Sequence, residues 1–253
     1  MSAVKKLTDF LRAARRKLIR RTRQPAVGKV DLGSLDRVTP VSSNWGFDRG
    51  TPVDRLYIEQ FIGDCRNDVR GRVLEVADNT YTLRFGGDRV TQSDILSNDA
   101  EDKRATLVLD LAQVEDAPEN QFDCIICTQT LHLIYDLAAA VQSLHKMLKP
   151  GGTLLLTGPT ITAISRWDAD RHGDHWRFTS AAVRRLFNDV FSGSEPVKKG
   201  SDPDIRSYGN VYAATAFLHG LAVEELDDKK LSCFDPDYEM LIAIRVQKQP
   251  ENQ

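Results

Sequence analysis

The chain has 253 residues, of which 41% are hydrophobic and 28% charged, and this length suits one large or two small globular domains. No apolar run approaches the roughly 18 residues of a membrane span, and the start is too charged for the apolar core of a signal peptide. Four scattered cysteines exclude a disulfide framework, so a reducing, cytoplasmic compartment is expected.

The net charge of −2 is unevenly distributed along the chain. Residues 1–24 hold nine bases and one acid, a charge of +8, which leaves −10 for the remainder. One helical face of this basic arm would carry its apolar residues, Leu7, Phe10, Leu11, Ala14 and Leu18. A basic amphipathic helix of this kind could bind an anionic membrane or another polyanion, or it could pack on the acidic body of the chain or on a second subunit of a homo-oligomer. The segment could instead act as a mitochondrial targeting peptide or be disordered.

The basic arm is expected to be followed by a linker, residues 25–44, and by one globular domain, residues 45–253. This domain opens on a turn-rich stretch, residues 44–52, that leads into a helix expected over residues 53–65. A stretch in this place suits a lid over a pocket, where Arg49 either meets a carboxylate or faces solvent.

Three short apolar runs follow, and each has an acidic residue at its expected end. We expect strands over residues 71–76, with Glu75 at the end, over residues 90–93, closing at Asp94, and over residues 106–109, closing at Asp110. Ligands of open parallel sheets bind outside the carboxyl ends of the strands. The three acids are therefore expected to gather at one site.

Residues 122–157, FDCIICTQTLHLIYDLAAAVQSLHKMLKPGGTLLLT, contain the most informative motif. They predict a buried strand over residues 124–127, a helix ended by a Pro-Gly-Gly turn at residues 150–152, and another buried strand over residues 153–157. Cys124 and Cys127 form C-x-x-C, but on a strand they point to opposite faces, which favours burial over redox or metal duty.

This segment resembles the region from the fourth to the fifth strand of class I S-adenosylmethionine-dependent methyltransferases, especially the type 11 branch. The shared pattern is F-D, an apolar strand with a polar end, L-H-x-x-x-D, an apolar helix and L-K-P-G-G. The resemblance covers residues 71–187 well. It implies a doubly wound, Rossmann-like α/β fold with a seven-stranded sheet whose last strand, expected over residues 239–246, is antiparallel. Residues 208–221 would add a helix before that strand.

The resemblance also implies S-adenosylmethionine as the cofactor. Asp94 lies 19 positions after Glu75, a spacing typical of a carboxylate that accepts hydrogen bonds from ribose hydroxyls, and Ile95 lies beside it. Asp110 would accept the adenine amino group, and Leu111 would cover the adenine ring. Glu75 would meet the methionine end of the cofactor.

Thr128 and Gln129, at the end of the fourth strand, would border the sulfonium and its methyl group. The turn after the first strand departs from the family pattern E-x-G-x-G-x-G, because it contains no glycine. The cofactor-binding residues expected in this turn are Ala77, Asp78, Asn79 and Thr80. Asp and Asn tolerate the left-handed conformation, so a tight turn is still expected. The alternative is a degenerate methyltransferase fold that serves as a non-catalytic binding or scaffold module.

The acceptor side is expected after the fifth strand, where residues 158–178 are rich in aromatic and titratable side chains. His172 or His175 suits a general base, and His132, just beyond the fourth strand, is a third candidate or else a packing residue. No metal-ligand spacing stands out, so no metal is expected.

The motif at residues 128–136, with H-G-D-x-W-R-F-T, also resembles bacterial methyltransferases associated with glycosyltransferases. This resemblance implies O-methylation of a glycan or another hydroxylated small molecule. A nicotinamide-dependent oxidoreductase would share the sheet, but the Pro-Gly-Gly turn follows a helix and not the first strand. The sequence therefore favours a methyltransferase over an oxidoreductase.

Overall fold

The computed structural model describes residues 25–191 and 203–250. The chain divides into two units, residues 1–39 and 40–253. The described part of the first unit contains one 3-10 turn, Gly33–Leu35. The basic arm lies outside the described residues, so its helix and its partners stay predictions. No helix within the described ranges is long and apolar enough to cross a membrane.

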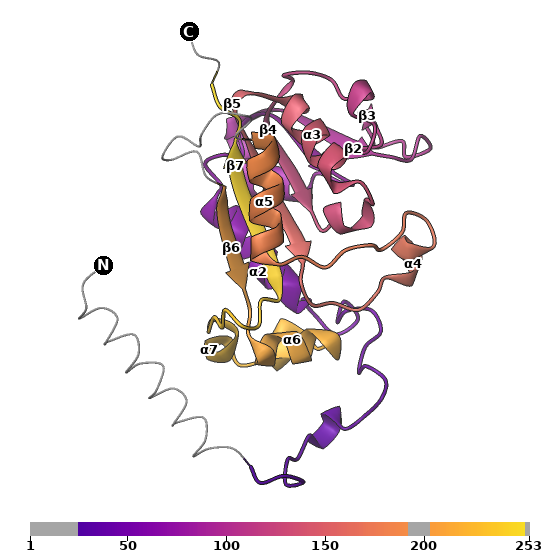
Figure 1. The fold of residues 1–253 in the computed structure, drawn as a ribbon, viewed down its shortest axis with the longest axis vertical. Helices are drawn as coiled ribbons and strands as arrows, with labels where there is room; N and C mark the ends of the chain where they lie inside the picture. Colours follow the sequence, from indigo (N-terminus) through magenta and orange to yellow (C-terminus); the bar gives the residue numbers. More distant parts are fainter. Residues whose placement is uncertain (1–24, 192–202, 251–253) are drawn as a thin grey trace, which may run out of the picture. The chain divides into compact units, whose positions relative to one another are not determined.

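The second unit is built on a seven-stranded sheet in the order β3-β2-β1-β4-β5-β7-β6 (Figure 1). The strands are β1 Gly71–Val76, β2 Val90–Ser97, β3 Leu107–Val108, β4 Phe122–Thr128, β5 Leu148–Pro159, β6 Asp204–Tyr208 and β7 Leu241–Gln247. The first five run parallel, and β7 is antiparallel to β5 and β6. The expected doubly wound α/β fold with an antiparallel last strand is confirmed.

Helices cover both faces of this sheet (Figure 1). The helices in the described part of this unit are α2 Val53–Asp64, α3 Leu137–Met147, α4 Arg166–Ala169, α5 Ser180–Phe191, α6 Val211–Leu218 and α7 Asp228–Leu231. Apolar residues of α3 and α5 belong to one buried cluster, and those of α2 and α6 belong to the other. The added helix expected between the last two strands is α6.

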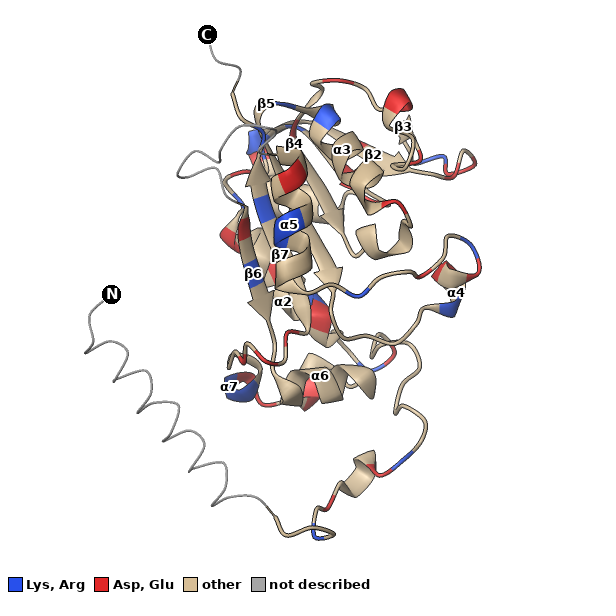
Figure 2. Ribbon diagram, viewed as in Figure 1, with Lys and Arg blue, Asp and Glu red and all other residues tan. Residues whose placement is uncertain are grey.

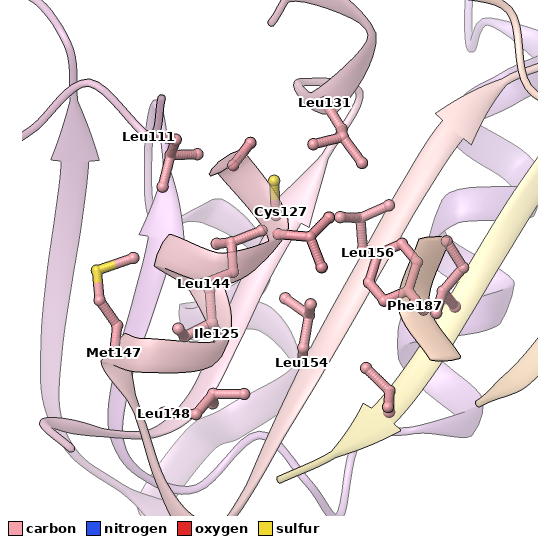
Figure 3. Packing of buried hydrophobic residues seen from close by; sticks show 14 of the residues in the cluster. Leu111, Ile125, Cys127, Leu131, Leu144, Met147, Leu148, Leu154, Leu156 and Phe187 are labelled. Atoms are coloured by element: carbon pink, nitrogen blue, oxygen red, sulfur yellow. The ribbon is translucent and has the colours of Figure 1, made fainter. Parts of the chain in front are cut away.

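Side chains alternate between the two faces of the sheet along each strand, so the buried residues form one cluster on each face. On β4, Ile125 and Cys127 join the cluster under α3 and α5, whereas Cys124 and Ile126 join the cluster under α2 and α6. Figure 3 shows the first cluster, in which Leu144 lies close to Ile125 and Cys127. The two cysteines are buried, free and on opposite faces, as their spacing predicts.

The strand order reverses between β1 and β4, which are parallel neighbours paired from Val73 with Cys124 to Glu75 with Ile126. The chain crosses from β1 to β2 on one side and from β4 to β5 on the other. A parallel sheet has its ligand crevice outside the carboxyl ends of the strands at such a reversal. The fold therefore places the ends of β1, β2, β3 and β4 around one site.

The N-terminal edge of the compact unit lies slightly earlier than the expected domain start. Residues 40–44 belong to this unit, because the main-chain N–H groups of Val41 and Ser42 donate to the carbonyl oxygen of His219 at 2.8 and 3.1 Å. The stretch after them is also held by the C-terminal third: Thr51 N donates to Glu224 Oε2 at 2.8 Å. The side chains of this stretch are thus available to line the site.

Three strands are longer than the sequence predicts. β4 was expected over residues 124–127 and spans Phe122–Thr128. β5 begins at Leu148, five residues before the expected Thr153, and takes the Pro-Gly-Gly turn into its first half. β2 was expected to close at Asp94, which is wrong, because the strand continues to Ser97. Ile95 and Leu96 extend the apolar run, and they are 9% and 2% exposed.

Asp94 consequently lies inside β2 and is 4% exposed. Arg72 of β1 donates to its carboxylate from Nε at 2.7 Å and from Nη2 at 3.3 Å, and the Thr106 hydroxyl donates at 3.0 Å. Burial acts to raise the pKa of Asp94, but the hydrogen bonds from Arg72 and Thr106 outweigh it and leave the pKa below 3.8. The carboxylate thus joins β1 to β2.

Replacing this carboxylate should destabilise the fold. Asp94→Ala removes the acceptor that Arg72 Nε and the Thr106 hydroxyl share, so we expect the free energy of unfolding at pH 7 to fall by about 2–3 kcal/mol. The stabilisation exists above pH 3.8 and is lost as the pH falls through the lowered folded-state pKa, so the difference should shrink below pH ~4. Urea denaturation at several pH values measures it.

Asp189→Ala is the matched control, because Asp189 faces Arg185 at 3.9 Å with both side chains exposed. It should cost less than about 1 kcal/mol. Equal losses in the two variants would contradict a structural role for Asp94.

Candidate active site

A cavity of about 1400 Å³ opens at the carboxyl ends of the first four strands. Its wall includes the turn after β1, the segment after β2, the ends of β3 and β4, and the segment around α4. Pockets for small ligands commonly measure about 300–1000 Å³. This cavity is therefore large enough for two ligands side by side, and we call it the outer cavity.

The turn after β1 is held by the buried carboxylate of Glu75, which is 2% exposed. Glu75 accepts hydrogen bonds from Tyr81 N at 3.1 Å and from both the N–H and the hydroxyl of Thr82 at 2.7 Å. Burial raises the pKa of Glu75 to about 7, although these donors act in the opposite direction. Glu75 lines the outer cavity, and its carboxylate organises the wall itself.

The same turn reaches a glycine-like conformation without glycine. Ala77 has a φ of 75°, and its N–H donates to the carbonyl oxygen of Leu96 at 2.9 Å. Asp78 then accepts from Thr80 N at 2.8 Å, which closes an Asx turn. Ala77, Asp78 and Thr80 all line the outer cavity. Asn79 does not: its side chain donates to the Ser93 hydroxyl at 3.2 Å.

The end of β2 brings other residues to the cavity than expected. Asp94 and Ile95 do not line it, because both lie inside the strand, whereas Ser97, Asn98 and Asp99 do. The Asp99 carboxylate accepts Glu101 N at 2.9 Å. The apolar pair Ile95–Leu96 was the sequence signal that the strand continues.

The ends of β3 and β4 agree with the expected positions. Asp110 and Leu111 line the cavity, where Asp110 accepts Ala112 N at 2.9 Å and Leu111 is 3% exposed. Thr128 and Gln129 also line it. Gln129 has a φ of 47° and donates its N–H to Thr157 O at 3.0 Å. A second non-glycine residue with positive φ thus lies at the cavity, where backbone strain tends to mark functional sites.

The segment around α4 supplies the remaining wall, and it carries charges of both signs (Figure 2). His172 and His175 are exposed and line the outer cavity together with Thr128 and Gln129. His172 Nδ1 lies 3.2 Å from the side-chain nitrogen of Asn98, and the His175 ring packs edge-on against Tyr135 at 5.4 Å. The two predicted base candidates therefore face the site from a surface segment.

His132 lies elsewhere, in the 3-10 turn Leu131–Leu133, and is 8% exposed. Its carbonyl oxygen accepts His175 N at 3.0 Å and Trp176 N at 3.2 Å, which ties the α4 segment to the end of β4. Burial lowers the pKa of the imidazole to about 4. Its side chain lines a smaller neighbouring cavity of about 220 Å³, which we call the inner cavity.

Arg55 of α2 is a cavity residue that the sequence analysis did not identify. It lines both cavities and donates from Nη1 to the Tyr81 hydroxyl at 3.1 Å. Arg49, which was considered for this place, instead donates from Nε to Glu225 at 2.9 Å. The sequence alone does not predict that an arginine in the first turn of a helix lines a cavity, because tertiary packing decides which way its side chain points.

The strain at Ala77 yields a prediction about stability. A left-handed non-glycine residue costs roughly 1–2 kcal/mol, so Ala77→Gly should raise the free energy of unfolding by about 1 kcal/mol after the entropy of glycine is subtracted. Ala112→Gly is the control, because Ala112 is in the same cavity wall and has no positive φ. That change should instead lower stability, and a drop in both variants would contradict the account of the turn.

Comparison with known proteins agrees with this geometry. The model of a family described as a methyltransferase domain matches residues 43–194, more than half of the chain. A ubiquinone/menaquinone biosynthesis C-methyltransferase UbiE of Edwardsiella ictaluri is 27% identical over 132 residues, 46% of this chain and 50% of that protein. The UbiE of Vibrio cholerae is 31% identical over 87 residues, 34% of this chain and 31% of that protein.

The chain thus spans about half or less of the curated relatives that it matches. Among solved structures, a putative sarcosine dimethylglycine methyltransferase from Galdieria sulphuraria has a TM-score of 0.50 and 14% identity, over 78% of this chain and 90% of that one. This likeness shows the shared fold. The family model matches the strands that build the cavity, so the chain belongs to the methyltransferase-domain family. Its fold is that of the class I S-adenosylmethionine-dependent methyltransferases.

Proposed function

We propose that this chain transfers a methyl group from S-adenosylmethionine to an acceptor, with both ligands in the outer cavity. One observation carries the proposal: a single cavity collects the ends of β1 to β4 at the point where the strand order reverses. Family membership supports the reaction class.

The donors and acceptors of the cavity fit the adenosine end of the cofactor. Asp99, beyond the end of β2, takes the ribose role that the sequence analysis gave to Asp94, because a carboxylate accepts two hydroxyl hydrogens. Asp110 suits the adenine amino group, and Leu111 offers an apolar wall to the ring. The carboxyl ends of β2 and β3 thus provide both polar and apolar contacts for a nucleoside.

The other half of the cavity fits a zwitterionic amino acid. The methionine ammonium would contact the backbone of the turn formed by Ala77, Asp78 and Thr80 and the Asp78 carboxylate. The methionine carboxylate would contact the Arg55 guanidinium. Within the described ranges, Arg55 forms no ion pair with a carboxylate. Thr128 and Gln129, at the end of β4, lie where the reacting methyl group would be.

The cofactor supplies an electrophilic methyl group on a sulfonium. The chain's own work is to hold the acceptor in line with that methyl group and to accept a proton from it. Three histidines are candidates for accepting the proton: His172 and His175 at the outer cavity and His132 at the inner cavity. His132 follows the end of β4, His175 N donates to its carbonyl oxygen, and His172 lies against Asn98 beyond the end of β2.

We propose a hydroxylated acceptor, such as a glycan, and therefore O-methylation. Support comes from exposed aromatic side chains in the cavity wall, since Tyr135 and Trp167 are 74% and 62% exposed. Aromatic faces with a polar rim suit ligands that have both apolar and hydroxyl-bearing surfaces. A purely non-catalytic scaffold role is not favoured, because the turn without glycine keeps the left-handed residue at Ala77.

Calorimetric titration with S-adenosylhomocysteine tests the cofactor site. Asp99→Ala and Asp110→Ala should each weaken binding roughly 10- to 100-fold, the usual worth of about 1.5–3 kcal/mol for a hydrogen bond to a charged group. Asp88→Ala is the control, because Asp88 is exposed and does not line the cavity, and its affinity should stay within about twofold. Wild-type protein without binding at millimolar ligand, or two site variants with unchanged affinity, would overturn the proposal.

A further inference from the structure

The inner cavity is a separate compartment beside the proposed methyl-transfer site. Phe47, Arg55, Gln129 and Asp168 line both cavities, so the two share a wall next to the end of β4. The rest of the inner wall mixes apolar and polar residues: Trp45, Pro159, Ala163, Phe217, Met240 and Leu241 are apolar, and Asp54, His132, Thr162, Ser165 and Asp174 are polar. At about 220 Å³ the inner cavity is smaller than a typical pocket for a whole ligand, so it suits one end group of a larger molecule.

Two polar side chains of this wall are incompletely satisfied. His132 Nδ1 and Asp54 Oδ1 are buried atoms without a hydrogen-bond partner among the described residues, and both residues line the inner cavity. His132 is more than nine-tenths buried. Buried polar atoms in native proteins nearly always have partners, and the cavity that both residues line offers the space for a ligand that supplies them.

The chemistry of the two atoms limits that ligand. A carboxylate oxygen accepts hydrogen bonds, and Nδ1 of a neutral imidazole accepts one when the proton is on Nε2. An apolar group would leave both atoms desolvated and unpaired. A group with at least two O–H donors and an apolar side satisfies both atoms and the aromatic walls.

We propose that the inner cavity holds a compact polyhydroxylated end group of the methyl acceptor, the size of one sugar ring, and that the hydroxyl bound to His132 Nδ1 is the one methylated. This inference rests on the proposed methyl transfer. It assigns proton acceptance to the buried His132, and it adds Asp54 as a binding residue for a second hydroxyl.

The proposed reaction requires only the two ligands and the His132 side chain. The acceptor oxygen forms a bond to the methyl carbon while the sulfur–carbon bond breaks, and that electron pair stays on sulfur. The O–H bond electrons stay on the acceptor oxygen, and its proton moves to His132 Nδ1. The resulting imidazolium then loses a proton to solvent, which restores the neutral base.

The surroundings of His132 keep it neutral before the reaction. Burial lowers its pKa to about 4, against the opposing effect of Asp174 and Asp168 and with the help of Arg177. Arg55 and Asp54 of α2 lie on the facing wall, and burial raises the pKa of Asp54. The base form of His132 therefore predominates at every pH above about 5, so His132 should contribute no rise in turnover from pH 6 to 8. An exposed histidine with an ordinary pKa of ~6.5 would instead give a rise across that range. Glu75, whose pKa is about 7, titrates in this range, and its effect on the site should appear equally in the pH dependence of S-adenosylhomocysteine binding.

Ligand-observed NMR tests binding with defined probes: myo-inositol and the methyl glycosides of glucose, galactose, mannose and rhamnose. We expect at least one probe to bind, with and without S-adenosylhomocysteine present. His132→Phe and Asp54→Asn should each weaken that probe at least tenfold and leave the S-adenosylhomocysteine affinity unchanged. His219→Phe is the matched control, because His219 Nδ1 is also buried and unpartnered but lies in neither cavity wall. That variant should bind the probe as wild type does.

Absence of binding by every probe up to its solubility limit, or unchanged probe binding in His132→Phe, would overturn this inference. Loss of S-adenosylhomocysteine binding by wild type would instead refute the proposed function on which it rests. Binding of propylammonium with no probe bound would identify an amine acceptor and also overturn it.

A second variant separates binding from proton transfer and covers the case in which His132→Phe fails to fold. His132→Asn keeps an amide oxygen that accepts a hydrogen bond close to the position of Nδ1 but removes the base. Methyl transfer from labelled S-adenosylmethionine to the bound probe should fall about 100- to 10,000-fold, with probe affinity within about threefold. Turnover that is unchanged in this variant, or wild-type turnover that rises between pH 6 and 8 while S-adenosylhomocysteine affinity stays constant, would contradict the assignment of His132.

Discussion

The buried carboxylate of Glu75 is the interaction on which the site depends. Glu75 is the penultimate residue of β1, at the reversal of strand order, and accepts three hydrogen bonds from Tyr81 and Thr82, so the chain must bend tightly across residues 76–82. This bend forces Ala77 into the left-handed region, where the family pattern has glycine. With the turn fixed, the ends of β2, β3 and β4 surround a cavity instead of a packed loop.

The sheet that supports this turn depends on a second carboxylate with a different role. Asp94 is ion-paired with Arg72 inside β2 and joins the two strands whose ends build the nucleoside side of the cavity. The chain therefore uses one acid to hold the strands together and another, Asp99, at the position open to ligand. Burial separates these roles: Asp94 is 4% exposed, whereas Asp99 is exposed.

Sequence patterns predicted the fold well, because the strands and helices bury continuous or periodic apolar runs. The run from Phe122 to Thr157 was enough to place β4, α3 and β5 in order, and Asp110, Leu111, Thr128 and Gln129 reached the cavity as expected. Asp94 could not be placed, because its partner Arg72 lies 22 positions away and the sequence does not show which carboxylate is paired. Arg55 and the inner cavity also gave no signal, since its walls come from segments between Trp45 and Leu241.

Amide hydrogen exchange with and without S-adenosylhomocysteine tests the central claim most directly, that the cofactor binds across the ends of the first three strands. The account predicts slower exchange at residues 76–82, 97–99 and 110–112, which lie at the cavity. Exchange should be unchanged at residues 92–94, which lie inside β2 next to the Arg72–Asp94 ion pair and do not line the cavity. Protection confined to other segments, or none at saturating ligand, would contradict the site described for this chain.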